Sequence, residues 1–229
     1  MSTYTRNNKE PAKRSNLAYE AIKRKLISGT LPSGARLDIT ALVEEIQTSR
    51  QPVLAAVNRL AAEGFLRVVS QVGCWVASVE PEEVADFFQL FAATEGLSCK
   101  LAAARRTQAQ LDALTMNLEA TARLIAAEVD LARQAQGFFL LNREFHGLVH
   151  DMAHSDYVAT QAGGMWDRCD FYLASADRHI QGERVSESEQ EHLAIAKAIA
   201  EGRVERAGEL MTAHIQSFGD AAVKHMTAR

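Results

Sequence analysis

The position of its β-rich segments is the sequence feature that most constrains the fold of this chain. Two runs of β-branched and aromatic residues, 65–69 and 74–79, flank a short turn at 70–73 and predict a β-hairpin. From residue 82 onward, no alternating apolar pattern typical of a strand occurs. The chain is therefore expected to join a small mixed α/β segment to a much longer, all-helical one.

Three helices are predicted before the hairpin. Apolar residues at helical spacing predict helices over 17–27 and 39–46, separated from a third helix by a tight turn at 47–48. Ser49 is expected to cap this third helix, which ends at Gly64. Two short helices joined by a tight turn and followed by a hairpin are typical of a winged helix-turn-helix.

The charge of the chain is unevenly distributed. The whole chain carries −4, but residues 1–80 hold 11 basic and 7 acidic side chains, a net +4, which leaves −8 on the remainder. A basic segment joined to an acidic one favours a first part that meets a polyanion. Chance clustering of charges is the alternative interpretation.

The start of the third helix supplies the side chains that could read DNA. Arg50 can make two hydrogen bonds to a guanine edge, and Gln51 can pair with adenine or with a phosphate. The helix N-terminus itself favours a phosphate. The alternative is a small α+β module that happens to carry surface arginines. We favour DNA binding.

The segments AIKRKLISGTLPSGARL and SRQPVLAAVNRLAAEGFLRVVSQVGCWV resemble the N-terminal domain of GntR-family bacterial transcription regulators, over almost all of residues 17–79. The resemblance implies that the third helix lies on double-stranded DNA and that the wing enters the adjacent groove. The DNA-binding residues expected on this basis are Arg36, Ser49, Arg50, Gln51, Arg59, Gln71 and Gly73.

One residue departs from that family pattern. Leu54 stands where the family carries an arginine after Pro-Val, so we expect an altered or more degenerate operator sequence rather than lost binding. Arg59 is a possible partial substitute, although a residue five positions further along does not share the same helix face.

The rest of the chain is expected to form an antiparallel bundle of six helices, in which ligands bind between facing helices. Ser186 and Glu189 are expected to form a capping box. The predicted helices are 82–106, 108–128, 131–153, 156–177, 187–201 and 203–225. The predicted organisation is a flexible basic N-terminus (1–16), the winged helix-turn-helix (17–79), a linker (80–83) and the helical domain (84–225).

Histidines on three of these helices could hold a metal ion. His146, His192 and His214 lie among inward-facing apolar residues, and Asn142 precedes His146 by one turn, on the same helix face. Imidazoles from three helices could converge on one divalent ion. A hydrogen-bonded core histidine is the alternative at each position. His150 and His154, further along the same helix, are expected to turn toward its solvated end.

The segments LNREFHGLVH, EHLAIAKAI and ELMTAHI are similar to the FCD effector domain of the FadR subfamily of GntR regulators, over residues 83–223 and in the length of the VanR-like group. The resemblance implies a divalent transition metal, zinc or nickel, and a small carboxylate effector. It assigns the metal ligands to Asn142, His146, His192 and His214. Asn142 replaces the more usual aspartate and brings no negative charge, so we expect weaker metal binding.

The sequence indicates the residues that would bind the effector less clearly than it indicates the metal ligands. Phe91 stands where many relatives carry an arginine, which removes an obvious carboxylate clamp. Thr94, Arg168 and Tyr172 are the polar candidates for effector binding, and a solvated helix residue is the alternative for Arg168.

Together these features predict a cytoplasmic, homodimeric, ligand-responsive DNA-binding regulator, more commonly a repressor, on a palindromic operator. No secretory signal or membrane span is expected. A metal-dependent hydrolase is the alternative from another class, although Glu144 and Glu191 are expected to point away from the site, which leaves no general base. A regulator that senses the metal itself or an acyl ligand is the third interpretation.

Overall fold

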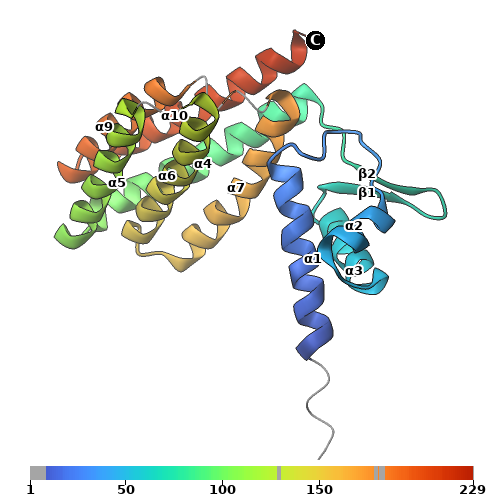
Figure 1. Cartoon of the computed structure of the whole chain (residues 1–229). Helices are drawn as coiled ribbons and strands as arrows, with labels where there is room; N and C mark the ends of the chain where they lie inside the picture. The colour runs from blue at the N-terminus through green and yellow to red at the C-terminus, as the bar shows by residue number, and fades with distance from the viewer. Residues whose placement is uncertain (1–8, 128–129, 178–179, 181–183, 229) are drawn as a thin grey trace, which may run out of the picture. The chain divides into compact units, whose positions relative to one another are not determined.

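The computed structural model describes the chain apart from residues 1–8, 128–129, 178–179, 181–183 and 229, and it is mainly α-helical (Figure 1). The described residues form two compact units. The first comprises the chain up to residue 79 together with 170–175, and the second comprises 80–169 together with 176–229.

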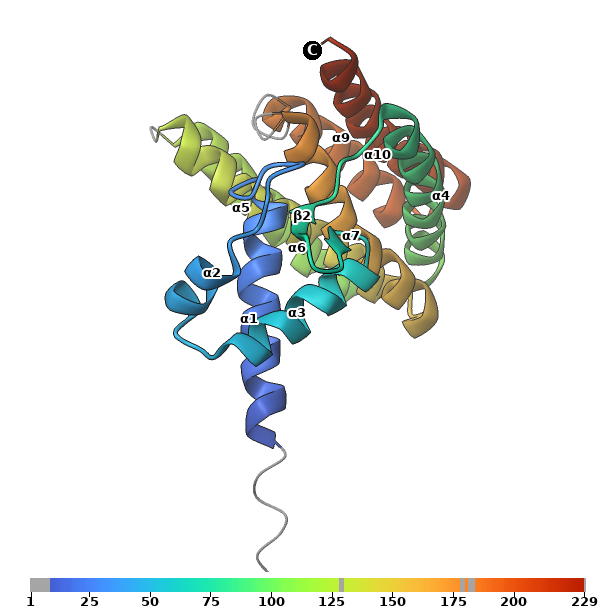
Figure 2. The ribbon, with the colours of Figure 1, turned by 90° about the vertical axis from the view of Figure 1, so that its right-hand side faces the viewer.

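The first unit contains three helices and a two-stranded sheet, as predicted. Helix α3 packs against both of the other helices and against the first strand, so it forms the centre of the unit (Figure 2). The antiparallel strands pair Leu66 with Val76 and Val69 with Gly73. The elements are α1 (Lys9–Ile27), α2 (Ile39–Ile46), α3 (Arg50–Ala62), β1 (Leu66–Val69) and β2 (Gly73–Val76).

Apolar residues of all these elements close the core of the first unit. Helix α1 packs against α3, and its Ile22 and Leu26 are buried, as is Val76 of β2. Burial of side chains of this size stabilises the unit by roughly 1.5–3 kcal/mol each. Leu17 of α1 is 58% exposed and lies outside this core.

The helix ends of the first unit have identifiable local causes. The Asp38 carboxylate accepts hydrogen bonds from the backbone N–H groups of Thr40 and Ala41, which fixes the start of α2. Ser49 occupies the N-cap position of α3, but its side chain makes no capping hydrogen bond, so that part of the prediction was wrong. Helix α1 begins at Lys9, within the segment 1–16 that was expected to be flexible.

The second unit confirms the six predicted helices, with every boundary within two residues of its prediction. The predicted capping box is wrong, because α9 begins at Val185 and Ser186 already lies inside it. Instead, Thr107 and Gln110 form a capping box at the start of α5. The helices are α4 (Pro81–Arg105), α5 (Gln108–Ala126), α6 (Leu131–Met152), α7 (Asp156–Asp177), α9 (Val185–Ala200) and α10 (Val204–Thr227).

Helices α4 and α10 form the most extensive contact of the second unit and run antiparallel (Figure 1). Glycines allow this close approach. A Cβ atom on Gly96 would lie 3.2 Å from the carbonyl oxygen of Gly208, and a Cβ atom on Gly219 would lie 2.5 Å from the Cβ of Phe88. Side chains at these positions would force the two helices apart.

Within the described residues, no helix combines the length and apolar character that crossing a lipid bilayer requires.

Candidate nucleic-acid interface and metal centre

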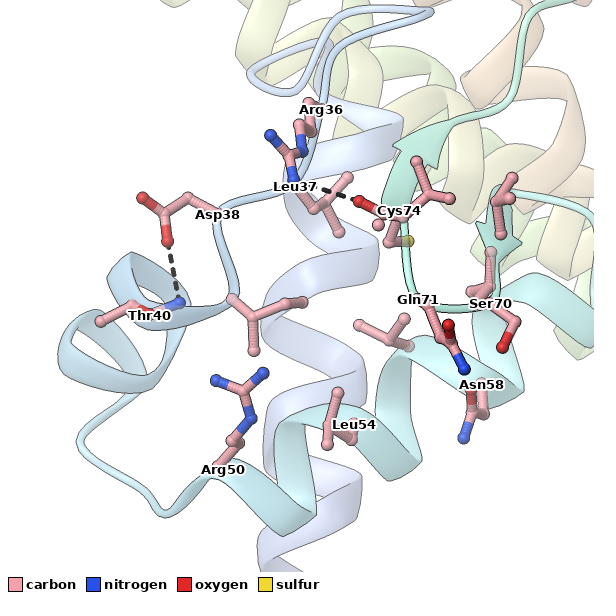
Figure 3. Close-up of a pocket in the computed structure, with 16 residues that line it drawn as sticks. Arg36, Leu37, Asp38, Thr40, Arg50, Leu54, Asn58, Ser70, Gln71 and Cys74 are labelled. Carbon is pink, nitrogen blue, oxygen red and sulfur yellow. Dashed lines mark hydrogen bonds between the residues drawn. The ribbon is translucent and has the colours of Figure 1, made fainter.

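A groove of about 700 Å³ lies on the first unit between α3, the segment leading into α2, and the hairpin (Figure 3). It brings together five residues that the sequence analysis singled out for DNA binding or for its departure from the family pattern. These residues are Arg36, Arg50, Leu54, Gln71 and Gly73. Residues from three different elements therefore meet on one exposed surface.

Arg36 contacts two residues of the hairpin that forms the wing. Its Nη2 donates a hydrogen bond to the carbonyl oxygen of Val72 at 3.1 Å, and its guanidinium lies 5.9 Å from the ring centre of Trp75. Gly73 has a φ of +152°, and a Cβ atom there would lie 3.2 Å from Arg36 Nε and from the Trp75 ring. Glycine is therefore needed for the arginine to pack against the hairpin.

The wing tip and the start of α3 complete the groove. Gln71 has a left-handed φ of 60°, and it is exposed, as are Arg50 and Gln51. Exposed donors at a helix N-terminus beside a wing are suited to phosphate and base-edge contacts.

Arg59 does not belong to this group. Its Nε donates to the Glu63 carboxylate at 3.1 Å, and its guanidinium stacks over the Tyr19 ring at 3.7 Å. The structure thus directs Arg59 toward Tyr19 of α1, and Arg59 is not among the residues that line the groove.

In the second unit, three histidines converge. His146 of α6, His192 of α9 and His214 of α10 are each at most 2% exposed, and each offers a ligand atom within 4.8 Å of the other two. The Nε2 atoms of His192 and His214 are 3.2 Å apart. Two nitrogens bound to one tetrahedral zinc ion at about 2.0–2.1 Å would be roughly 3.3 Å apart. The observed spacing matches that of two ligands directed at one ion.

Carboxylates behind two of the rings determine which nitrogens face the centre. His146 Nδ1 is 2.9 Å from Glu95 of α4, and His214 Nδ1 is 2.6 Å from Glu191 of α9. Each carboxylate can accept the Nδ1 proton, which leaves Nε2 as the free ligand nitrogen. Glu191 was expected to point away, and this prediction was wrong: its side chain reaches across to the next helix. Glu144, by contrast, accepts a hydrogen bond from Asn117.

Burial keeps the rings of His146 and His192 in the neutral form that binds metals. It lowers the pKa of His146 to about 4, although the hydrogen bond to Glu95 acts in the opposite direction. It also lowers the pKa of His192 well below its usual value, and the neighbouring His214 adds to this effect. For Glu95, burial raises the pKa, but the hydrogen bonds from His146 and His150 outweigh it and lower the pKa to about 2.

Aromatic rings hold the histidines in place. Phe145 stacks on His192 with ring centres 3.9 Å apart, and Trp166 lies 4.3 Å from His146. Trp166 also donates its indole N–H to Glu95. Phe91, in the position where relatives carry an arginine, packs edge-on against Trp166. Its apolar side chain thus supports the metal-facing ring indirectly.

Two members of this centre were missed by sequence reasoning. Glu95 is fully buried, and it also accepts a hydrogen bond from His150 Nε2 at 2.7 Å. The prediction that His150 turns toward solvent was wrong, because it is 8% exposed, whereas His154 is exposed as expected. One signal was available: Glu95 lies in a largely apolar part of α4, where a buried carboxylate needs partners.

The residues present fit a bound metal ion by a further observation. His146 Nε2 and Asn142 Oδ1 are buried, and neither has a hydrogen-bond partner in the described structure. Orphaned buried polar atoms are costly unless a ligand or ion satisfies them. Both lie on α6 one turn apart, in the positions assigned to metal ligands from the sequence.

The effector candidates Thr94, Arg168 and Tyr172 lie on α4 and α7. The Thr94 hydroxyl donates to the carbonyl oxygen of Leu90 in its own helix. Arg168 is half-buried on α7, and Tyr172 is buried in the part of α7 that groups with the first unit.

Comparisons with known proteins decide the family. Residues 14–76 match the model of the bacterial regulatory proteins of the gntR family, and residues 86–217, more than half of the chain, match the FCD domain. This chain is a GntR-family transcription regulator with an FCD domain. The family assignment accounts for both the DNA-facing groove and the helical unit that follows.

Relatives of this GntR regulator carry the same function in their names. The HTH-type transcriptional repressor RspR of Escherichia coli is 26% identical over 208 residues, 89% of this chain and 86% of its own. YdhC of Bacillus subtilis, an HTH-type transcriptional regulator, is 24% identical over 143 residues, 61% of each chain. The fold matches that of E. coli McbR/YncC with a TM-score of 0.76 at 19% identity, covering 93% of this chain and 98% of that one. RspR and YdhC are named as transcriptional regulators and not as enzymes, so the hydrolase interpretation is set aside.

Proposed function

We propose that this regulator senses a small carboxylate through a divalent transition metal held in the FCD domain, and that the bound ligand changes its affinity for operator DNA. The observation that carries the proposal is the convergence of His146, His192 and His214 within 4.8 Å. Asn142 is the fourth proposed ligand, because its buried Oδ1 has no hydrogen-bond partner among the described residues. Zinc or nickel suits this set of nitrogen donors and an amide oxygen.

The charges around the site support an anionic effector. The four proposed ligands are neutral, so a bound cation would keep its attraction for a carboxylate. Glu95 and Glu191, behind His146 and His214, offset part of the charge and favour retention of the metal. Thr94, Arg168 and Tyr172 remain proposed effector contacts.

In the first unit, Arg36, Ser49, Arg50, Gln51, Gln71 and Gly73 are the proposed DNA contacts. The groove of the first unit supports this assignment for the four of them that line it. We further propose a homodimer in the bacterial cytoplasm, because one recognition helix reads one half-site and two-fold proteins match palindromic operators. Repression is the proposed sign of regulation, since the relatives named above include a repressor.

A thermal-shift experiment tests the sensing site. Metal-free protein, zinc- or nickel-loaded protein, and loaded protein with mono- and dicarboxylates are compared, because a ligand of the folded state raises its melting temperature. We expect a carboxylate-dependent shift that requires the metal. His192→Ala should abolish it, whereas His154→Ala, which alters an exposed histidine at the end of α6, should retain it. A shift that survives in His192→Ala would place the site elsewhere.

The same materials distinguish a metal sensor from a carboxylate sensor. DNA binding is followed with metal alone and with metal plus carboxylate. If the metal alone produces the full change in DNA affinity, the ion is the signal and the carboxylate proposal is wrong.

A further inference from the structure

The exposed face of α3 combines polar side chains with an apolar one. Arg50, Leu54 and Asn58 are spaced by four residues, so they share one helix face, and all three line the groove of the first unit (Figure 3). Leu54 is apolar, yet 39% of its surface is exposed. This face therefore presents a cation, an apolar group and an amide in a row.

Leu54 is not an isolated exposed apolar residue. Three wing residues that line the same groove, Val68, Val69 and Val72, are 46%, 37% and 58% exposed. Single exposed apolar side chains are ordinary, but several in one groove indicate a binding surface. Arg36 and Arg50 line this groove as well, and the one acidic lining residue, Asp38, is engaged in capping α2, so the groove suits an anionic occupant that also offers an apolar group.

Duplex DNA meets both requirements. Its phosphates complement the arginines, and the thymine C5-methyl is the apolar group that its major groove displays. Building on the DNA binding of this family, we propose that Leu54 is a specificity-determining residue that contacts a thymine methyl group in the operator.

The spacing along α3 sharpens this inference. Four residues of helix rise about 6 Å, which is roughly the length of two base-pair steps. If Arg50 pairs with a guanine, Leu54 faces a base pair one or two steps away. The operator half-site is thus expected to contain a guanine followed at that distance by a thymine on either strand.

The test begins with selection of bound sequences from a pool of random duplex DNA by the full-length protein. We expect an enriched half-site with a fixed thymine. Replacing that thymine by deoxyuridine removes only the methyl group and should weaken binding about fourfold. The same replacement outside the enriched site is the control and should change binding less than twofold.

Variants assign the effect to Leu54. In Leu54→Ala, deoxyuridine at the fixed position should no longer weaken binding, because the methyl group has lost its partner. Leu54→Arg, selected again on the random pool, should replace the thymine by guanine. Val72→Ala is the matched control: it shortens an exposed apolar side chain of the same groove and should keep the deoxyuridine effect. Circular dichroism confirms that each variant is folded.

Three outcomes would contradict the proposed role of Leu54. An enriched half-site whose thymines tolerate deoxyuridine overturns the role of Leu54 and leaves DNA binding intact. A deoxyuridine effect that disappears in Val72→Ala but persists in Leu54→Ala assigns methyl recognition to the wing instead and also overturns it. Absence of any enriched sequence would overturn both this inference and sequence-specific DNA binding.

Discussion

Glu95 is the residue that orients part of the histidine cluster. Its two carboxylate oxygens lie within hydrogen-bond distance of His146, His150 and Trp166, and no part of the residue is exposed. A buried carboxylate with three partners is held in one orientation, and it holds its partners in return. The orientation of His146 is thus set by a residue 51 positions away in the sequence.

Glu95→Gln should therefore weaken metal binding about 10- to 100-fold. The glutamine amide has one acceptor oxygen in place of two, so His146 and His150 can no longer both be satisfied. Competition with a coloured zinc chelator measures the affinity. Glu209→Gln, which alters an exposed carboxylate of α10 paired with Arg206, should bind zinc as the unaltered protein does. An affinity within twofold of normal in Glu95→Gln would contradict the orienting role.

The histidines also make stability depend on pH in the metal-free protein. The pKa of His146 is about 4 in the folded state and about 6.5 in the unfolded chain. Between these values the unfolded chain binds a proton that the folded one does not, so the free energy of unfolding falls as the pH falls through this window. For His146 alone the loss approaches about 3 kcal/mol at its lower end, and His192 acts in the same direction.

Urea unfolding in the presence of a chelator, from about pH 7 to pH 4.5, measures this loss. His154→Ala should keep the same pH dependence, since its side chain is exposed. The lowered pKa of Glu95 adds a further loss only below about pH 4.5. A free energy of unfolding that stays constant over the measured range would contradict the burial of neutral rings.

Sequence reasoning found the three histidines but not the groups that orient them. His146, His192 and His214 interrupt apolar helical patterns, which is a local signal. The pairings of Glu95 with His146 and of Glu191 with His214 join different helices, and the helical period of one segment does not reveal its neighbour. The same limit applies to Arg59, whose partner Tyr19 lies on another helix.

At the scale of elements, the helices of the second unit were predictable because residues close to each helix end, such as capping residues, indicate its boundary. Asp130 caps α6 by accepting from the backbone N–H of Arg133, as its position before an apolar pattern suggests. The beginning of α9 was placed two residues late, because Ser186 resembles a cap in sequence but lies inside the helix. Helix α1 was also predicted to begin too late, at residue 17 instead of Lys9. Its first turns carry no apolar pattern, so nothing in the sequence indicated a helix there.

Glycine-to-alanine substitutions at two positions should change the stability of the protein in opposite directions. Gly219→Ala would bring a Cβ atom within 2.5 Å of Phe88, so it should destabilise the protein by about 1–3 kcal/mol. Gly147→Ala is the matched control: it lies inside α6, and its new Cβ would have no neighbour within 4 Å. Alanine there should stabilise the helix by up to about 1 kcal/mol. Urea unfolding at neutral pH compares them, and equal effects of the two substitutions would show that this helix contact tolerates a methyl group.

For the whole molecule, the uneven charge now has a structural counterpart. The basic residues 1–80 contain the groove with Arg36 and Arg50, and the acidic remainder contains the histidine centre with its two carboxylates. A sequence can show that two such parts exist, because composition and periodicity change at residue 80. It cannot show how a ligand in one part alters the other, since that depends on a free-energy difference between conformations of the complete protein.

That coupling is open to a thermodynamic test. If a carboxylate with the metal weakens operator binding by a factor of about ten, the operator must weaken carboxylate binding by the same factor, because the coupling free energy belongs to both equilibria. Carboxylate is titrated into metal-loaded protein with and without saturating operator duplex, and operator is titrated with and without carboxylate. His192→Ala should bind operator as the metal-free protein does and ignore the carboxylate. Unequal factors in the two titrations would mean that a further equilibrium contributes, such as carboxylate binding to DNA or removal of the metal by the carboxylate, and would contradict the proposed coupling.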